Sequence, residues 1–119
     1  MKSITFGAVI LALAASAAPA EPITDPLRTH LIAGWVKYCQ GTFDTPSMKK
    51  SWTNQEISDF CNCGSVTMAD RTTQEMYDTR QKQGDYPKEW WTMREEVRVY
   101  CTDKYVKTPD VSGIKDKKW

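Results

Sequence analysis

Four cysteines, and the spacing of the middle two, constrain the fold of this 119-residue chain more than any other feature. Cys61 and Cys63 are separated by one residue, in a segment whose apolar pattern predicts a helix. Two such positions lie roughly 200° apart around a helix axis, so the side chains point to nearly opposite sides. They cannot bond to each other without unwinding the helix. Each must therefore pair with Cys39 or Cys101, and the sequence leaves open which pairs with which.

The first twenty residues have the pattern of a cleaved secretory signal. Lys2 provides a positive start, residues 4–20 are almost all apolar or small, and Ala18-Pro19-Ala20 places small residues where a signal peptidase cuts. Residues 15–17 offer a second cleavage site. The alternative is a membrane anchor, but an apolar run of about 17 residues is at the lower limit for spanning a bilayer. We predict an exported protein of the periplasm or extracellular space, with no stable membrane insertion after cleavage.

The remaining chain of about 99 residues is large enough for one domain. Loss of Lys2 leaves 15 basic and 15 acidic residues, and this balance gives no reason to expect a nucleic acid partner. A core of this size is marginal, and small exported domains usually add disulfides. We predict a helical, disulfide-stapled domain at residues 21–108 and a flexible basic C-terminal tail at residues 109–119.

Four segments show the apolar spacing of helices, and no segment alternates like a half-buried strand. The predicted helices begin at residues 25, 53, 72 and about 87. The first ends near Gly41, the third near Gly84 and the fourth near Lys107. Residues 42–51 contain Pro46 and are expected to form a loop. The fold class that follows is all-α, a small bundle of three to four helices stapled by two disulfides.

Capping motifs and apolar stripes support these helices. Thr53 and Glu56 form a capping box, and residues 72–75 form a second one. Trp52, just before the first box, can pack on Ile57 as a hydrophobic staple. The stripes expected to face the core are Leu27, Leu31, Trp35, Tyr38 and Cys39 on the first helix; Ile57, Phe60, Cys61, Gly64 and Met68 on the second; and Trp90, Met93, Val97, Tyr100, Cys101 and Tyr105 on the fourth.

A chemical role for Cys61 and Cys63 is the alternative to two structural disulfides. A Cys-x-Cys pair can act as a redox couple where a thiolate is activated. Copper or zinc could also bind these cysteines; further ligands available are His30, Met68, Met76 and Met93. However, no Lys, Arg or His lies within four residues of the pair, and the chain has one His and no Cys-x-x-Cys. We therefore expect no cofactor and no metal.

The sequence carries no recognisable catalytic constellation. His30 is the single imidazole and has no nucleophile beside it in the sequence. Glu95 and Glu96 are adjacent, but neighbours on a helix point about 100° apart and are typical of a solvated face. The chain has no glycine-rich phosphate loop, metalloprotease motif or nucleophile elbow. We expect that the protein is not an enzyme.

The five tryptophans are the remaining indication of function. Trp90 fits the apolar stripe of the fourth predicted helix, whereas the helix neighbours of Trp91 are polar. Trp91 is therefore expected either to pack under the third helix or to be exposed. An exposed Trp flanked by Arg and Glu is typical of a protein-binding hot spot. The predicted partner-binding residues are Trp91, Arg94, Arg98 and Tyr86, with the basic tail and Trp119 as a second element.

Three short segments are similar to parts of the periplasmic acid-activated chaperones: Ser51-Trp52-Thr53, Cys101-Thr102-Asp103-Lys104 and Lys115-Asp116-Lys117. The similarity covers about ten residues, and the four cysteines here depart from that family's pattern. The resemblance is one of architecture, since these chaperones are small, exported, helical and disulfide-bonded.

The sequence as a whole indicates a small exported helical protein, monomeric or weakly dimeric, that binds another protein of unknown identity. An accessory factor, an inhibitor and a chaperone all fit this description. Two alternatives remain: a thiol–disulfide or metal-handling protein that uses Cys61 and Cys63, and a structural component of an envelope assembly.

Overall fold

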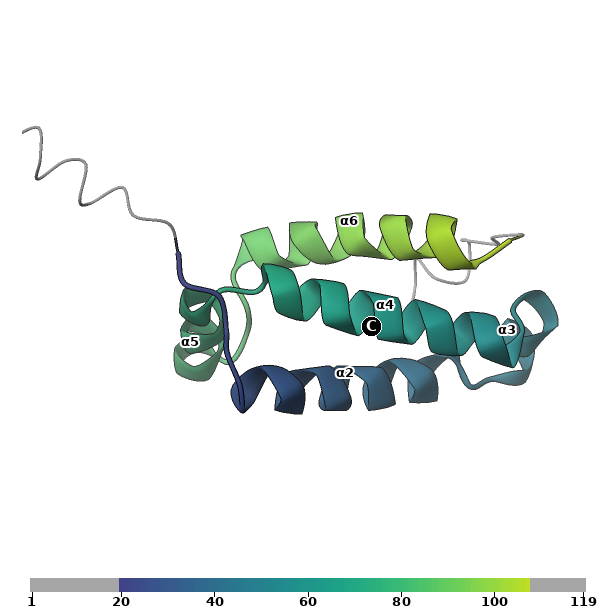
Figure 1. Ribbon diagram of the computed structural model, residues 1–119, viewed down its shortest axis with the longest axis horizontal. Coiled ribbons are helices and arrows are strands. Elements are labelled where there is room, and N and C mark those ends of the chain that lie inside the picture. Colours follow the sequence, from purple (N-terminus) through teal and green to yellow (C-terminus); the bar gives the residue numbers. More distant parts are fainter. Residues whose placement is uncertain (1–19, 108–119) are drawn as a thin grey trace, which may run out of the picture.

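Three long helices lie side by side in the computed structural model, which describes residues 20–107 (Figure 1). These are α2 (Leu27–Phe43), α4 (Asn54–Arg71) and α6 (Lys88–Tyr105), with α4 in the middle and running opposite to its neighbours. Two shorter helices, α3 (Pro46–Ser51) and α5 (Gln74–Gln83), lie at opposite ends of the layer. The predicted all-α fold is confirmed. The basic tail lies outside the described residues, as does the signal peptide apart from residue 20.

Both disulfides join the central helix to a neighbour. Cys39 of α2 bonds to Cys61, and Cys101 of α6 bonds to Cys63. The Cα atoms of the two pairs are 5.6 and 5.9 Å apart, a separation that suits a disulfide. The prediction that α4 is stapled on both sides is confirmed, and the pairing that the sequence left open is settled.

The core lies along the two sides of α4 that meet α2 and α6. All five residues of the predicted α4 stripe are buried, as are Trp90, Met93, Val97 and Cys101 of α6. The predicted stripes of α2 and α6 were wrong at Tyr38 and Tyr100, whose side chains are 57% and 53% exposed. Because α2 and α6 each pack mainly against α4, Cys39 and Cys101 occupy the buried side and the tyrosines before them turn outward.

The segment expected to be a loop contains a helix. α2 continues through Gly41 to Phe43, and α3 begins after Thr45, whose side chain accepts a hydrogen bond from the Met48 backbone N–H. Pro46 stands at the first position of α3, where its missing N–H costs nothing. The loop prediction was wrong because these capping residues start a helix of only six residues, too short to show apolar periodicity.

Three aromatic side chains hold this end of the molecule together. Phe43 stacks on Trp52 with ring centroids 5.9 Å apart, and both rings meet Phe60 edge-on at 5.5 and 5.2 Å. All three are essentially inaccessible to solvent. The cluster therefore joins the end of α2, the residue that ends α3 and the first half of α4. Thr53, next to Trp52, forms the predicted capping box with Glu56.

The junction of α4 and α5 differs in detail from its prediction. The cap of α5 is Thr73, whose hydroxyl accepts from the Met76 backbone N–H, and not Thr72. The Thr72 hydroxyl is buried, donates to the Met68 carbonyl at 2.6 Å and accepts from Trp90 Nε1 at 3.0 Å. Residues 21–23 run antiparallel to this junction through two backbone hydrogen bonds, which bury Ile23.

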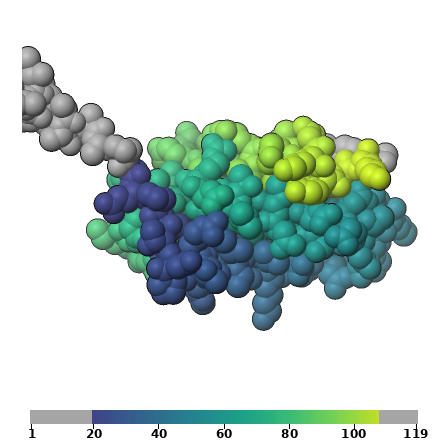
Figure 2. All heavy atoms as spheres, in the orientation of Figure 1, coloured from purple at the N-terminus to yellow at the C-terminus, as the bar shows by residue number. Residues whose placement is uncertain are grey.

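Within residues 20–107, no helix is long and apolar enough to cross a membrane. In the space-filling view, atoms of α4 reach the surface between α2 and α6 along this face (Figure 2). The two disulfides are those expected of an oxidising compartment outside the cytoplasm.

Candidate functional site

A pocket of about 340 Å³ lies where α2, α4 and α6 meet the turn between α5 and α6. Its lining combines aromatic rings with two guanidinium groups, one carboxylate and the hydroxyls of one serine and two tyrosines. The residues are Trp35 and Tyr38 from α2; Ser65 and Met68 from α4; Arg80, Gly84, Asp85 and Tyr86 from the end of α5 and the turn; and Trp90, Trp91 and Arg94 from α6.

Four of the rings form one continuous cluster. Tyr86 and Trp90 are stacked with centroids 4.1 Å apart, and Trp35 contacts them from α2 at 6.5 and 6.0 Å. Trp91 meets Trp90 edge-on at 5.0 Å. Contacts of this kind favour fixed ring positions. The aromatic wall is therefore formed before any ligand arrives.

The turn between α5 and α6 places Tyr86 and Trp91 in this cluster. Gly84 ends α5 with a φ of 84°, a left-handed conformation that costs little only for glycine. Asp85 follows, and its Oδ1 accepts hydrogen bonds from the Tyr86 backbone N–H at 2.8 Å and from Trp91 Nε1 at 3.2 Å. Pro87 then precedes α6 as its N-cap residue. One carboxylate oxygen thus holds the backbone of Tyr86 and the indole of Trp91.

Two arginines lie over these rings. The guanidinium carbon of Arg80 is 5.6 Å from the centroid of the Tyr86 ring, and that of Arg94 is 5.3 Å from the Trp91 ring. Burial lowers the pKa of Arg94, and the nearby Glu95 carboxylate opposes that effect. Burial also raises the pKa of Tyr86, against the opposing influence of Arg80. The pocket lining carries two positive charges and one negative charge.

Ser65 brings an unsatisfied hydroxyl to the pocket. The residue is only 1% exposed, and its Oγ has no hydrogen-bond partner within residues 20–107. A buried hydroxyl without a partner is unfavourable and uncommon. The residue is one of those that line the pocket.

The structure brings together three of the four predicted partner-binding residues. Trp91, Arg94 and Tyr86 line the pocket, but Arg98 does not. Trp91 is half-buried, meets Trp90 edge-on and donates to Asp85 in the turn that follows α5, which is a placement between the two expected ones, under the third helix or exposed. Trp119 and the tail lie outside the described residues.

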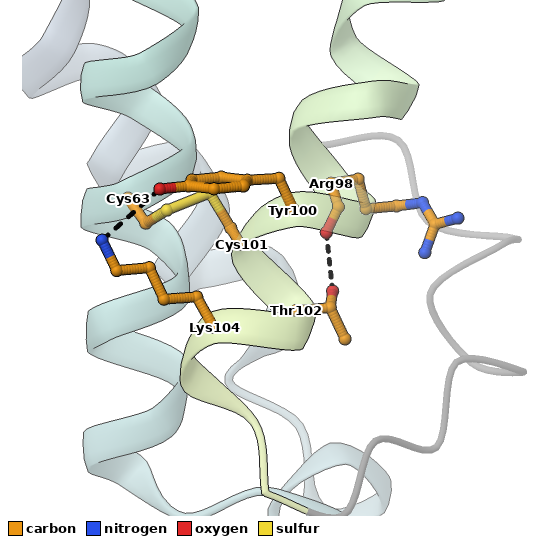
Figure 3. Close-up of a disulfide and its surroundings, with 6 residues drawn as sticks. All are labelled: Cys63, Arg98, Tyr100, Cys101, Thr102 and Lys104. Carbon is orange, nitrogen blue, oxygen red and sulfur yellow. Dashed lines mark hydrogen bonds between the residues drawn. A yellow bond between two sulfur atoms is a disulfide. The ribbon is translucent and has the colours of Figure 1, made fainter.

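Arg98 is buried, contrary to its predicted place in an exposed patch. It is 7% exposed, and its guanidinium donates to the Glu95 carboxylate through Nε at 2.9 Å and also through a terminal nitrogen. Figure 3 shows its side chain pointing away from the Cys63–Cys101 disulfide. Thr102 is buried as well and donates to the Arg98 carbonyl at 2.7 Å. Pairing with Glu95 compensates the charge of Arg98 and allows this burial.

Sequence reasoning missed the pocket residues contributed by other elements. Ser65, Arg80 and Asp85 carry no motif of their own, and Trp35 was assigned to the core. Arg80 lies in the last turn of α5 and Asp85 directly after its glycine cap, so only the capping signal at Gly84 indicates that they are near the start of α6.

The other candidate chemical groups lie apart from the pocket. His30 is exposed on α2. Glu95 pairs with Arg98, and Glu96 pairs with Arg71 of α4 at 3.3 Å. Within the described residues, no group of three or more His, Cys, Asp or Glu side chains could hold a metal ion. All four cysteines are in disulfides, with Cys61 and Cys63 in different bonds.

Comparison with protein-family models, curated protein sequences and solved structures finds no match to this chain.

Proposed function

We propose that the protein is an exported, non-catalytic binding protein that holds a segment of another protein in its aromatic pocket. The observation that carries this proposal is a preformed cluster of four rings, open to ligand, with a guanidinium over each of two rings. Tyr, Trp and Arg are the residue types that dominate protein-binding hot spots. Such residues bind strongly when their positions are already fixed.

The polar groups of the pocket suit recognition better than catalysis. Asp85 already accepts two hydrogen bonds that hold the pocket together. Ser65 has no base beside it in the lining, which contains neither imidazole nor thiol. A pocket of about 340 Å³ is at the small end for ligand sites, so it would accept one large side chain of a partner.

The proposal can be tested by selecting peptides against the purified, fully oxidised protein. Two displayed libraries would be used, one with free peptide C-termini and one with the random segment flanked on both sides. Selected peptides would be synthesised and titrated by tryptophan fluorescence, since Trp35, Trp90 and Trp91 lie in the pocket. We expect Trp91→Ala to weaken binding by about tenfold or more, the usual size of a hot-spot loss.

Tyr100→Ala is the matched control. Tyr100 is also an aromatic residue of α6, but it is 53% exposed and lies beside Lys104, away from the pocket lining (Figure 3). Its loss should leave peptide affinity unchanged. Circular dichroism and a thiol assay would establish that both variants are folded and oxidised. Failure to select any peptide, or equal affinity of selected peptides for Trp91→Ala and the parent protein, would refute the proposed function.

A further inference from the structure

The pocket combines an aromatic wall with two guanidinium groups and a single carboxylate, and this combination restricts its ligand. We infer that, if the pocket binds a partner protein as proposed above, it recognises the C-terminal residue of that partner, an apolar side chain together with the terminal carboxylate. The side chain would pack against the aromatic cluster, and the carboxylate would meet Arg80, Arg94 and the hydroxyl of Ser65.

The size of the pocket restricts the ligand to about one residue. A volume of about 340 Å³ accommodates one large side chain and its backbone, but not a helix or an extended strand. Trp35, Met68 and Trp90 contribute apolar surface to the lining. A single apolar residue at the end of a chain can enter such a pocket without bringing a second segment of backbone with it. An internal residue would have to bury polar backbone on both sides.

The charged groups of the lining favour an anionic group on the ligand. Arg80 lies over Tyr86 and Arg94 over Trp91, whereas Asp85 is the one carboxylate in the lining. Asp85 is already engaged with the Tyr86 N–H and the Trp91 indole. Within residues 20–107, no ion pair is made by Arg80. A guanidinium over a ring still presents N–H donors at its edge, and these donors suit the two oxygens of a carboxylate.

The hydroxyl of Ser65 also favours a ligand that can accept a hydrogen bond. Its Oγ is buried in the lining without a hydrogen-bond partner among the described residues. A carboxylate accepts hydrogen bonds and would satisfy this donor. An all-apolar ligand would fill the same space and leave the hydroxyl unpaired, which is the costly outcome for a buried polar group. The hydroxyl therefore favours a ligand with an acceptor over a purely hydrocarbon one.

The test uses defined tripeptides, so it does not depend on finding the natural partner. N-acetyl-Gly-Ala-X would be prepared with X as Leu, Phe or Trp, each as the free acid and as the C-terminal amide. Binding would be measured by isothermal titration calorimetry and by backbone chemical shifts. We expect at least one free acid to bind about tenfold or more tightly than its amide, because charge-assisted hydrogen bonds are lost in the amide.

Arg80→Gln and Arg94→Gln should each reduce the preference for the free acid, and the double variant should abolish it. Lys104→Gln is the matched control, because Lys104 also lies over a tyrosine ring, at 5.7 Å from the centroid of Tyr100, but outside the pocket (Figure 3). Ser65→Ala should weaken the acid more than the amide. Far-UV circular dichroism would establish that each variant retains its helices.

Three results would overturn the inference. Equal affinity for acids and amides would show that the pocket does not recognise the terminal carboxylate. If none of the tripeptides binds, the C-terminal residue of a protein is not the ligand of this pocket. Binding of 3-phenylpropionate as tightly as the Phe tripeptide would identify a free organic acid instead. None of these results refutes the proposed function by itself, because library peptides that bind through internal residues in a Trp91-dependent way would still support it.

Discussion

Replacement of Phe43 by alanine is the sharpest test of the packing at the end of the molecule opposite the pocket. Phe43 is completely buried, stacks on Trp52 and meets Phe60 edge-on. A buried Phe→Ala change costs about 3–5 kcal/mol of unfolding free energy. Because Phe43 also makes two aromatic contacts, we expect a loss of about 4 kcal/mol, at the middle of this range.

A loss of this size is large for a small single domain. Domains of this class have unfolding free energies of about 5–15 kcal/mol. Each kilocalorie shifts Tm by about 4–8 °C, so Phe43→Ala should lower Tm by about 16–32 °C. The measurement is thermal and urea unfolding of the oxidised protein, followed by circular dichroism. Intact disulfides keep the unfolded reference state the same for parent and variant.

Two matched variants separate the causes. Phe43→Leu keeps most of the volume but loses the ring contacts, and it should cost about 1–2 kcal/mol. Tyr100→Ala removes an equally large ring from an exposed site and should cost less than about 1 kcal/mol. A cost below about 1.5 kcal/mol for Phe43→Ala would show that the packing of Phe43, Trp52 and Phe60 does not hold α2, α3 and α4 together as described.

Three further predictions concern a crosslink, a carboxylate and a turn. Replacing both Cys63 and Cys101 by alanine should lower the unfolding free energy measured in urea by about 4 kcal/mol, because the closed loop has a separation of 38 residues. Hydrogen bonds from the backbone N–H groups of Thr53 and Lys107 hold the pKa of Glu56 below its ordinary value. Stability should therefore fall as pH drops through that lowered pKa, and Glu56→Gln should make the decline in urea midpoints shallower. Gly84→Ala should cost about 1 kcal/mol in thermal unfolding, because alanine is strained at a φ of 84°; an unchanged Tm would contradict the turn geometry.

The helix starts could be predicted where the signal is local. The capping box of Thr53 and Glu56 involves residues three apart, so it is visible in the sequence and present in the structure. The choice between Thr72 and Thr73 as the cap of α5 is not local. Thr72 is buried, and its hydroxyl accepts a hydrogen bond from the indole of Trp90, which lies 18 residues further on. A sequence window that contains only the capping box does not contain that contact.

The end of α2 also depends on a contact that local sequence preferences do not contain. Glycine weakens a helix by about 1 kcal/mol, and that preference predicted an end at Gly41. Burial of Phe43 against Trp52 and Phe60 contributes several times as much, so the helix continues through the glycine. Tertiary packing therefore decided a boundary that intrinsic preference placed two residues earlier.

The candidate site could be predicted only where its members are close in sequence. Tyr86, Trp91 and Arg94 lie within nine residues, and their composition indicated a binding surface. Trp35 and Ser65 come from α2 and α4, and their place in the pocket depends on how α4 turns between its neighbours. The rule that Cys61 and Cys63 have different partners followed from helix geometry. Which of the two cysteines faces α2 depends on how α4 is rotated about its own axis.

The two disulfides also determine the covalent topology of the chain. The bond between Cys39 and Cys61 closes one ring, and the bond between Cys63 and Cys101 closes a second ring that starts two residues later. The backbone through Asn62, an exposed residue in the middle of α4, is the single covalent connection between these rings. A proteolytic cut inside either ring leaves the fragments attached to each other. A cut on either side of Asn62 separates the oxidised protein into two fragments, each with one intact disulfide. One fragment carries α2 and α3, and the other carries α5 and α6.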